Sequence, residues 1–116
     1  MTYSNFKHGD IVVVNLPFTD FSDIKKRPAI VVSSNKFNRR SKDVIIAKIT
    51  GTEFSHGLSI GITNDDLEQG ELKKESYIDL SLILTVEKKL MGKPIANVKK
   101  NISTEIKGKL SELFDI

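Results

Sequence analysis

The chain of 116 residues contains no cysteine, which excludes a disulfide framework, a thiolate nucleophile and a cysteine-based metal site. No apolar run approaches the roughly 18–20 residues that a membrane-spanning helix needs. The N-terminal residues, MTYSNFKH, lack the apolar core of a signal peptide. These absences predict an intracellular, cytoplasmic protein that does not bind a membrane.

The composition is that of an ordinary folded protein, with 39% hydrophobic and 28% charged residues, and it excludes a collagen-like or largely disordered chain. The length predicts a single domain over residues 1–116, because two domains would each be too small to bury a core. The formal net charge is only +3. This charge is compatible with a polyanionic partner, but the positions of the cations matter more than their number.

Short runs rich in β-branched residues, separated by polar or glycine-containing connections, predict a mainly β protein. We expect strands over residues 9–16, 28–34, 43–50, 57–62, 76–80 and 82–86, with a bend between the last two. Residues 18–26 and 35–42 are expected to be loops. One helical turn is expected over residues 63–69, with Thr63 or Asn64 as its cap and Gly70 as its end.

The C-terminal segment has helical periodicity. Ile106, Leu110, Leu113 and Phe114 lie at positions i, i+4, i+7 and i+8, which form one stripe of an α-helix. Ser103 is a suitable N-cap for this helix. Several short strands and one terminal helix predict a small, strongly bent antiparallel barrel with the helix packed against it.

Few residues suit familiar catalytic or metal sites. The two histidines, His8 and His56, are far apart in the sequence and nothing pairs them, so exposed turn histidines are the simpler interpretation. The acidic residues are scattered, and we expect neither a metal site nor a cofactor. The sequence has no Ser-His-Asp arrangement, glycine-rich phosphate loop or nucleotide fingerprint.

Two local features could support chemistry on an anion. The basic run Lys25-Lys26-Arg27 ends a predicted loop, and Pro28 favours an extended backbone at Arg27. Thr50 ends a predicted strand and is followed by Gly51 and Thr52, at a boundary where functional sites are often built. Taken alone, the first feature also fits a solvated loop edge, and the second fits a threonine that ends its strand.

Together with their spacing, these features resemble the MazF/PemK/Kid family of toxin endoribonucleases from type II toxin–antitoxin modules. The resemblance extends in order over nearly the whole chain. Its matching segments are GDIVVV (9–14), PFTD (17–20), KRPAIVVS (26–33), IAKIT (46–50), the segment from Gly70 through Ser76-Tyr77-Ile78, and LTV (84–86). The resemblance implies an SH3-like barrel with a C-terminal helix and a homodimer.

The resemblance also implies an activity: sequence-selective cleavage of single-stranded RNA without a metal ion, leaving a 2′,3′-cyclic phosphate and a 5′-hydroxyl, with inhibition of translation and growth. It assigns catalysis to Arg27 and Thr50, places residues 18–26 over the RNA groove, and puts Ser76 near the substrate. Arginine can donate two hydrogen bonds to phosphate oxygens. The expected RNA-binding residues are Phe18, Phe21, Lys25, Lys26, Thr52, Lys73, Lys74 and Ser76.

The sequence departs from the family pattern at two places. Asp79 and Ser81 occupy positions where some members carry a second arginine and an aspartate, and residues 22–25 replace a Glu-Gln pair.

The expected protein partner is an acidic, partly disordered antitoxin. Two other functions compete with the ribonuclease: a catalytically silent nucleic-acid-binding module, and a toxin of the same fold that acts on a protein such as gyrase.

Overall fold

The structure is a computed structural model that describes residues 5–17, 24–52 and 58–116. In this part of the chain seven strands form one antiparallel sheet in the order β4-β6-β3-β2-β1-β7-β5. The strands are β1 (Asp10–Pro17), β2 (Ile24–Val31), β3 (Asp43–Thr50), β4 (Ser59–Ile62), β5 (Leu67–Gly70), β6 (Ser76–Glu87) and β7 (Ala96–Val98). The helices are α1 (Asn35–Arg40) and α2 (Lys100–Phe114), with short 3₁₀ turns η1 (Asn64–Asp66) and η2 (Lys88–Leu90).

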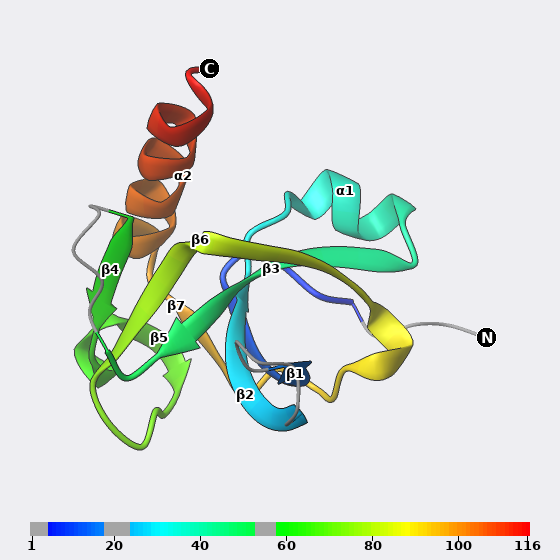
Figure 1. Ribbon diagram of the computed structural model, residues 1–116, viewed down its shortest axis with the longest axis horizontal. Coiled ribbons are helices and arrows are strands. Elements are labelled where there is room, and N and C mark those ends of the chain that lie inside the picture. The colour runs from blue at the N-terminus through cyan, green and yellow to red at the C-terminus, as the bar shows by residue number, and fades with distance from the viewer. Residues whose placement is uncertain (1–4, 18–23, 53–57) are drawn as a thin grey trace.

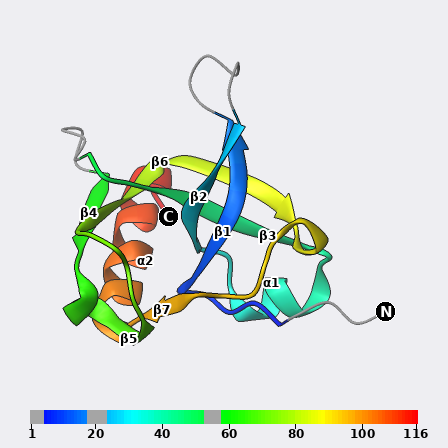
Figure 2. The same ribbon diagram turned by 90° about the horizontal axis from the view of Figure 1, so that it is seen from below.

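The sheet curls strongly into a half-barrel, with α2 beside β4 and β6 and α1 near the start of β3 (Figures 1 and 2). This confirms the prediction of a mainly antiparallel β protein with a C-terminal helix. Both faces of the central strands are buried: Ile11 belongs to the core cluster that includes α2, whereas Val12 and Val14 belong to a second cluster. The nearly continuous apolar run of β1 follows from this double burial.

The bend predicted near residue 81 lies within one continuous strand. On the β3 side Ala47 pairs with Ile83, but the next residue, Lys48, pairs with Asp79. Residues 80–82 are therefore extra on β6, and such a bulge bends and twists a strand. The position of the bend was predicted correctly, but its division into two strands was wrong.

The strand over residues 43–50 was predicted with its observed bounds, and the one over 9–16 is displaced by one residue. Strand β2 begins earlier than predicted, because Lys25 and Lys26 pair with Leu16 and Asn15 and so lie in the sheet instead of in a loop. The short strand β7 was not predicted. It is only three residues long and exists through its pairing with β1 and β5.

The segment over residues 35–42 was predicted as a loop, but it contains helix α1. The Ser34 side chain caps this helix by accepting a hydrogen bond from the Phe37 amide at 3.1 Å. Asn38 is buried and donates from Nδ2 to the Ser33 carbonyl at 3.1 Å. Tertiary burial of this asparagine therefore stabilises a helix that has no apolar stripe of its own.

The predicted turn over residues 63–69 is correct only in its first half. Thr63 caps η1, and Asp66 completes a reciprocal capping box. Residues 67–70 form β5 instead of a longer helical turn. Gly70 has a φ of +88°, and a Cβ atom there would lie 2.3 Å from the Ile95 carbonyl oxygen, so this close strand pairing requires glycine.

Helix α2 begins at Lys100, with Lys99 as N-cap, so Ser103 lies inside the helix and the predicted cap was wrong. The predicted stripe is buried only in part: Ile106 is fully buried, whereas Leu113 and Phe114 are 41% and 59% exposed. The C-terminal end of α2 extends beyond the sheet (Figure 1), so these two side chains have no core to enter. Within the described ranges, neither helix has the length and apolar character needed to cross a membrane.

Candidate functional site

Arg27 and Thr50 lie on neighbouring strands. In the pairing of β2 with β3, Ala29 is opposite Lys48. The β2–β3 ladder ends at this pair, and Arg27 and Thr50 each lie two residues beyond it, on the same face of the strand as Ala29 and Lys48. The sheet therefore brings together two residues that are 23 positions apart in the sequence.

These two side chains line a cavity of about 310 Å³. Its lining residues are Arg27, Lys48, Ile49, Thr50, Gly51, Thr52 and Lys74. Arg27, Lys48 and Thr50 are half-buried, and among the residues that the structure describes no carboxylate is part of the lining. The cavity therefore combines three cationic side chains with two threonine hydroxyls.

Gly51 lets a lysine from another loop reach this cavity. A Cβ atom at Gly51 would lie 3.3 Å from Lys74 Nζ, so the ammonium group rests against the backbone there. Next to it, the Thr50 Oγ1 atom accepts a hydrogen bond from the Thr52 amide at 3.3 Å. With its oxygen held in this way, the Thr50 hydroxyl can donate its proton to a bound anion.

The structure has a second cavity, of about 350 Å³. Its lining residues are Val13, Lys26, Pro28, Glu71, Leu72, Lys73, Lys74, Ser76 and Ile95. Lys26 and Pro28 alternate with Arg27 along β2, so the two cavities open on opposite faces of this strand. Lys74 lines both cavities and links them.

The loop over residues 71–75, which carries Lys73 and Lys74, is fixed at both of its ends. The Leu72 amide donates to Asn64 Oδ1 at 2.8 Å, and the Leu72 side chain packs in the core. At the other end, the buried Ser76 hydroxyl donates to the Lys74 carbonyl at 3.0 Å. The two lysines therefore project from an anchored backbone.

Most of the residues expected from the sequence are brought together here: Arg27, Thr50, Thr52 and Lys74 in the first cavity, and Lys26, Lys73, Lys74 and Ser76 in the second. Phe18, Phe21 and His56 lie outside the described residues, as does the side chain of Lys25. Lys48 was missed. Its spacing of two residues from Thr50 on the same strand was the available signal.

Asp79 takes part in the packing and hydrogen bonding of β6. It is buried and accepts hydrogen bonds from the amide, at 2.9 Å, and from the hydroxyl of Ser81. Its cross-strand neighbour is Lys48, at the bulge between β3 and β6. Asp79 lines neither cavity, so the departure from the family pattern at residues 79 and 81 is accommodated by a local hydrogen-bonded turn in β6.

His8 lies far from the cavity that contains Arg27. It precedes β1, where its ring contacts the Val32 carbonyl at 3.1 Å, whereas Arg27 is paired with Val14 near the other end of β1. Six residues of extended chain span about 20 Å. Burial lowers the pKa of His8 below its ordinary value of 6.5. His8 therefore cannot serve as an acid or base at Arg27 within the same chain.

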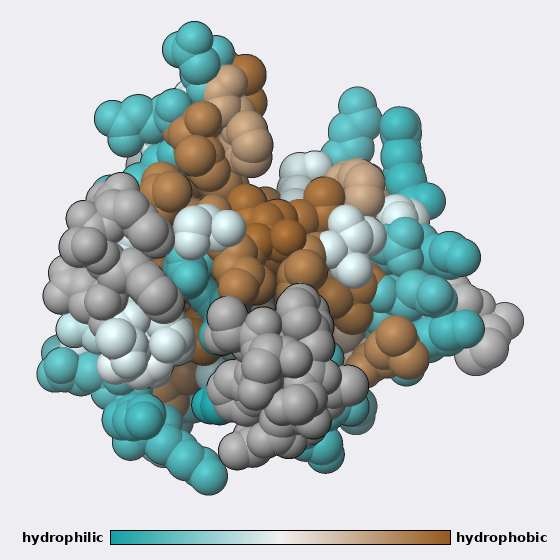
Figure 3. Space-filling model, in the orientation of Figure 1, coloured by the Kyte–Doolittle hydropathy of each residue, from teal (hydrophilic) through white to brown (hydrophobic). Residues whose placement is uncertain are grey.

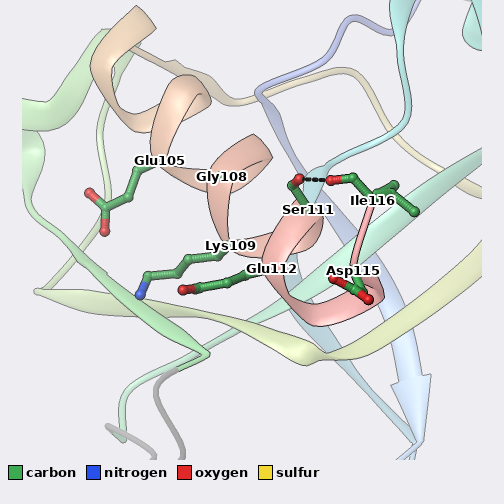
Figure 4. A pocket seen from close by; sticks show the side chains of 7 residues that line it. All are labelled: Glu105, Gly108, Lys109, Ser111, Glu112, Asp115 and Ile116. Atoms are coloured by element: carbon green, nitrogen blue, oxygen red, sulfur yellow. Dashed lines mark hydrogen bonds between the residues drawn. The ribbon is translucent and has the colours of Figure 1, made fainter.

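A depression of about 580 Å³ lies along the C-terminal turns of α2 (Figure 4). It is lined by Glu105, Gly108, Lys109, Ser111, Glu112, Asp115 and Ile116, and Ser111 donates a hydrogen bond to the Ile116 carbonyl. Three carboxylates against one lysine repel a phosphate, so this depression does not suit RNA. No group of three or more histidine and acidic side chains within 5–17, 24–52 and 58–116 is arranged to hold a metal ion.

A comparison with protein families identifies the class of protein to which this chain belongs. The model of the family described as "PemK-like, MazF-like toxin of type II toxin-antitoxin system" matches residues 7–114. The chain therefore belongs to this family, as the resemblance of its motifs implied. A search of curated protein sequences finds no match.

Solved structures agree with this assignment at the level of the fold. An endoribonuclease from Mycobacterial species superposes with a TM-score of 0.78 at 18% identity, covering 100% of this chain and 97% of the other. An endoribonuclease in complex with its cognate antitoxin, also from Mycobacterial species, gives 0.77 at 19% identity, with 95% of each chain covered. MazE-MazF from Deinococcus radiodurans gives 0.75 at 15% identity, covering 97% and 99%.

Proposed function

We propose that this protein is a toxin endoribonuclease that cleaves single-stranded messenger RNA at selected sequences and so inhibits translation and growth. The observation that carries the proposal is that Arg27 and Thr50 line one cavity, whose described lining has three cationic side chains and no carboxylate. Such a site suits a phosphodiester, whose charge increases as the reaction proceeds. The structurally similar endoribonucleases support the same activity.

The proposed reaction uses the substrate's own nucleophile. The ribose 2′-hydroxyl loses its proton to water and attacks the adjacent phosphorus, and the bond to the 5′-oxygen breaks. The 5′-oxygen takes up a proton from water, so the products are a 2′,3′-cyclic phosphate and a 5′-hydroxyl. Arg27 donates two hydrogen bonds to non-bridging oxygens of the five-coordinate phosphate, and Thr50 donates one. Lys48 and Lys74 add positive charge beside the same phosphate. None of these roles requires a metal ion or a cofactor.

Two partners follow from the surface of the protein. A cationic site of this kind is silenced by a segment that carries negative charge, so we assign it an acidic antitoxin that is partly disordered when free. The Mycobacterial endoribonuclease complex with its cognate antitoxin supports this assignment. With an RNA substrate and such an antitoxin, we propose that the protein acts in the cytoplasm.

The second partner is another copy of the chain. Apolar side chains line the flank of α2 and continue over the sheet between α2 and α1 (Figure 3). The exposed large apolar residues of β6 and α2 are Leu82, Leu84, Leu113 and Phe114. An apolar surface that spans two elements is typical of a homodimer interface.

The test is incubation of the purified protein with a mixed-sequence RNA, with and without excess EDTA, followed by chemical mapping of the new ends. We expect cleavage at a restricted set of sequences, cyclic phosphate ends, and the same rate in EDTA. An Arg27→Ala preparation, purified in parallel, controls for contaminating ribonuclease. Binding of RNA without cleavage would replace the proposal with the silent binding module, and loss of cleavage in EDTA would refute the metal-independent mechanism.

A further inference from the structure

The lining of the second cavity suits the chemistry of a nucleobase. Its lining includes the apolar side chains of Val13, Pro28, Leu72 and Ile95, with charged and polar side chains around them. A nucleobase has the same division, with apolar faces and polar edges. A volume of about 350 Å³ lies within the range of small-ligand pockets.

The position of this cavity ties it to the RNA path. It lies directly behind Arg27, since Lys26 and Pro28 flank Arg27 on β2 and point to the other face. Lys74 lines both cavities. A strand whose phosphate contacts Arg27 and Lys74 can therefore place a neighbouring base in the second cavity.

Among the described residues, Glu71 is the one carboxylate that lines either cavity. A carboxylate beside an RNA strand repels phosphates, but it can still accept hydrogen bonds from a base. The backbone of Glu71 is held in position, because the next residue, Leu72, is buried and its amide donates a hydrogen bond to Asn64 Oδ1 at 2.8 Å. An ionised carboxylate can only accept hydrogen bonds, so a base edge that contacts Glu71 has to donate them.

We propose that the second cavity is a guanine subsite and that Glu71 determines its specificity. Guanine presents two adjacent donors, N1–H and the 2-amino group, which match the two carboxylate oxygens, and it also presents acceptors O6 and N7, which match lysine ammonium groups. Uracil has one ring N–H between two carbonyl oxygens, which a carboxylate repels. Adenine and cytosine offer one amino group each, next to a ring acceptor.

This subsite rests on the proposed function, so its test uses both cleavage and binding. The substrates are short uridine-rich RNAs with one guanosine, inosine, adenosine or cytidine at each position flanking the scissile bond. Inosine lacks only the 2-amino group of guanine. At one position we expect inosine to lower kcat/KM by about 10–100-fold with the wild-type protein, because it loses one of the two hydrogen bonds to the charged carboxylate.

Glu71→Gln should reduce this guanine-to-inosine difference to within about threefold, because a carboxamide has only one acceptor oxygen. Glu75→Gln is the matched control: Glu75 is in the same loop and exposed, but it does not line the cavity. The control should keep the wild-type preference. An unchanged preference in Glu71→Gln, or no preference for guanine at any position in the wild type, would overturn the subsite.

The same oligonucleotides with 2′-fluoro sugars have no nucleophile and report binding alone, by fluorescence anisotropy. Selective binding of guanine that depends on Glu71, in a protein that cleaves no RNA, would refute the proposed function and leave the subsite standing. Cleavage that does not depend on the base beside Glu71 would refute the subsite and leave the proposed function standing. The two proposals therefore fail separately.

Discussion

Replacement of Arg27 is the most direct test of the cationic cavity. Arg27→Ala removes the one guanidinium group in a cavity that also holds Lys48, Thr50 and Lys74. Two unit charges 4 Å apart interact by about 4 kcal/mol at the effective dielectric constant typical of a protein surface. Because Arg27 is only half-buried and two lysines remain, part of this energy is retained, and we expect a rate loss of about 10²–10³-fold.

Arg27→Lys separates charge from geometry. Lysine keeps the positive charge but cannot make the two parallel hydrogen bonds of a guanidinium group. We expect this variant to recover only part of the rate, with a remaining loss of about 10-fold or more. Near-complete recovery would show that Arg27 acts as a simple point charge.

The assay is single-turnover cleavage of a short RNA, with circular dichroism and thermal unfolding as checks of the fold. Arg40→Ala is the matched control, since it removes the same charge from an exposed arginine of α1. The strand β3 separates α1 from Thr50 by about 24 Å. The assignment of Arg27 is refuted if its alanine variant, equally folded, cleaves as fast as Arg40→Ala.

Three further predictions concern single side chains. Thr50→Val should lower the cleavage rate by about 10-fold or more in the same assay and keep the strand, because only the hydroxyl is lost; a normal rate would remove Thr50 from the site. Gly70→Ala should lower the free energy of unfolding by about 2–4 kcal/mol in urea titrations, since the glycine has positive φ and a Cβ atom there meets the Ile95 carbonyl. Gly108→Ala, in an open helical position, should raise the free energy of unfolding by about 0.5–1 kcal/mol. Equal effects of the two substitutions would contradict this prediction. Burial lowers the pKa of His8, so as the pH falls below 6.5 the unfolded chain binds a proton at His8 before the folded chain does, and the free energy of unfolding decreases. His8→Gln should therefore lose less stability than the wild type between about pH 7.5 and 5.5. An unchanged dependence of stability on pH would show that His8 does not contribute.

The local pattern of the sequence was enough for the elements that bury both faces. Residues 43–50 alternate and cluster β-branched residues so strongly that β3 was predicted with its observed bounds. The segments from GDIVVV through KRPAIVVS and IAKIT were also enough to indicate the family before the fold was known. Each of these segments is short, and its residue types and order along the chain can be read without knowing the fold.

Other elements depend on partners that are distant in the sequence. Strand β7 is three residues long and is stabilised by β1 and β5. Helix α1 depends on a buried asparagine and a serine cap, neither of which gives a hydrophobic period. The helix α2 was predicted, but the exposure of Leu113 and Phe114 follows from where the sheet ends, and no helical stripe contains that information.

The site shows the same division. The sequence by itself identified Arg27 and Thr50 as separate candidates, one beside Pro28 and one at a strand end. Only the packing of β2 beside β3 brings them to one cavity, and only the fold of the loop over residues 71–75 brings Lys74 to both cavities and Glu71 to the second. Residue types and local propensities are encoded in short segments, whereas strand register and cavity lining arise from burial and hydrogen bonding over the whole sheet.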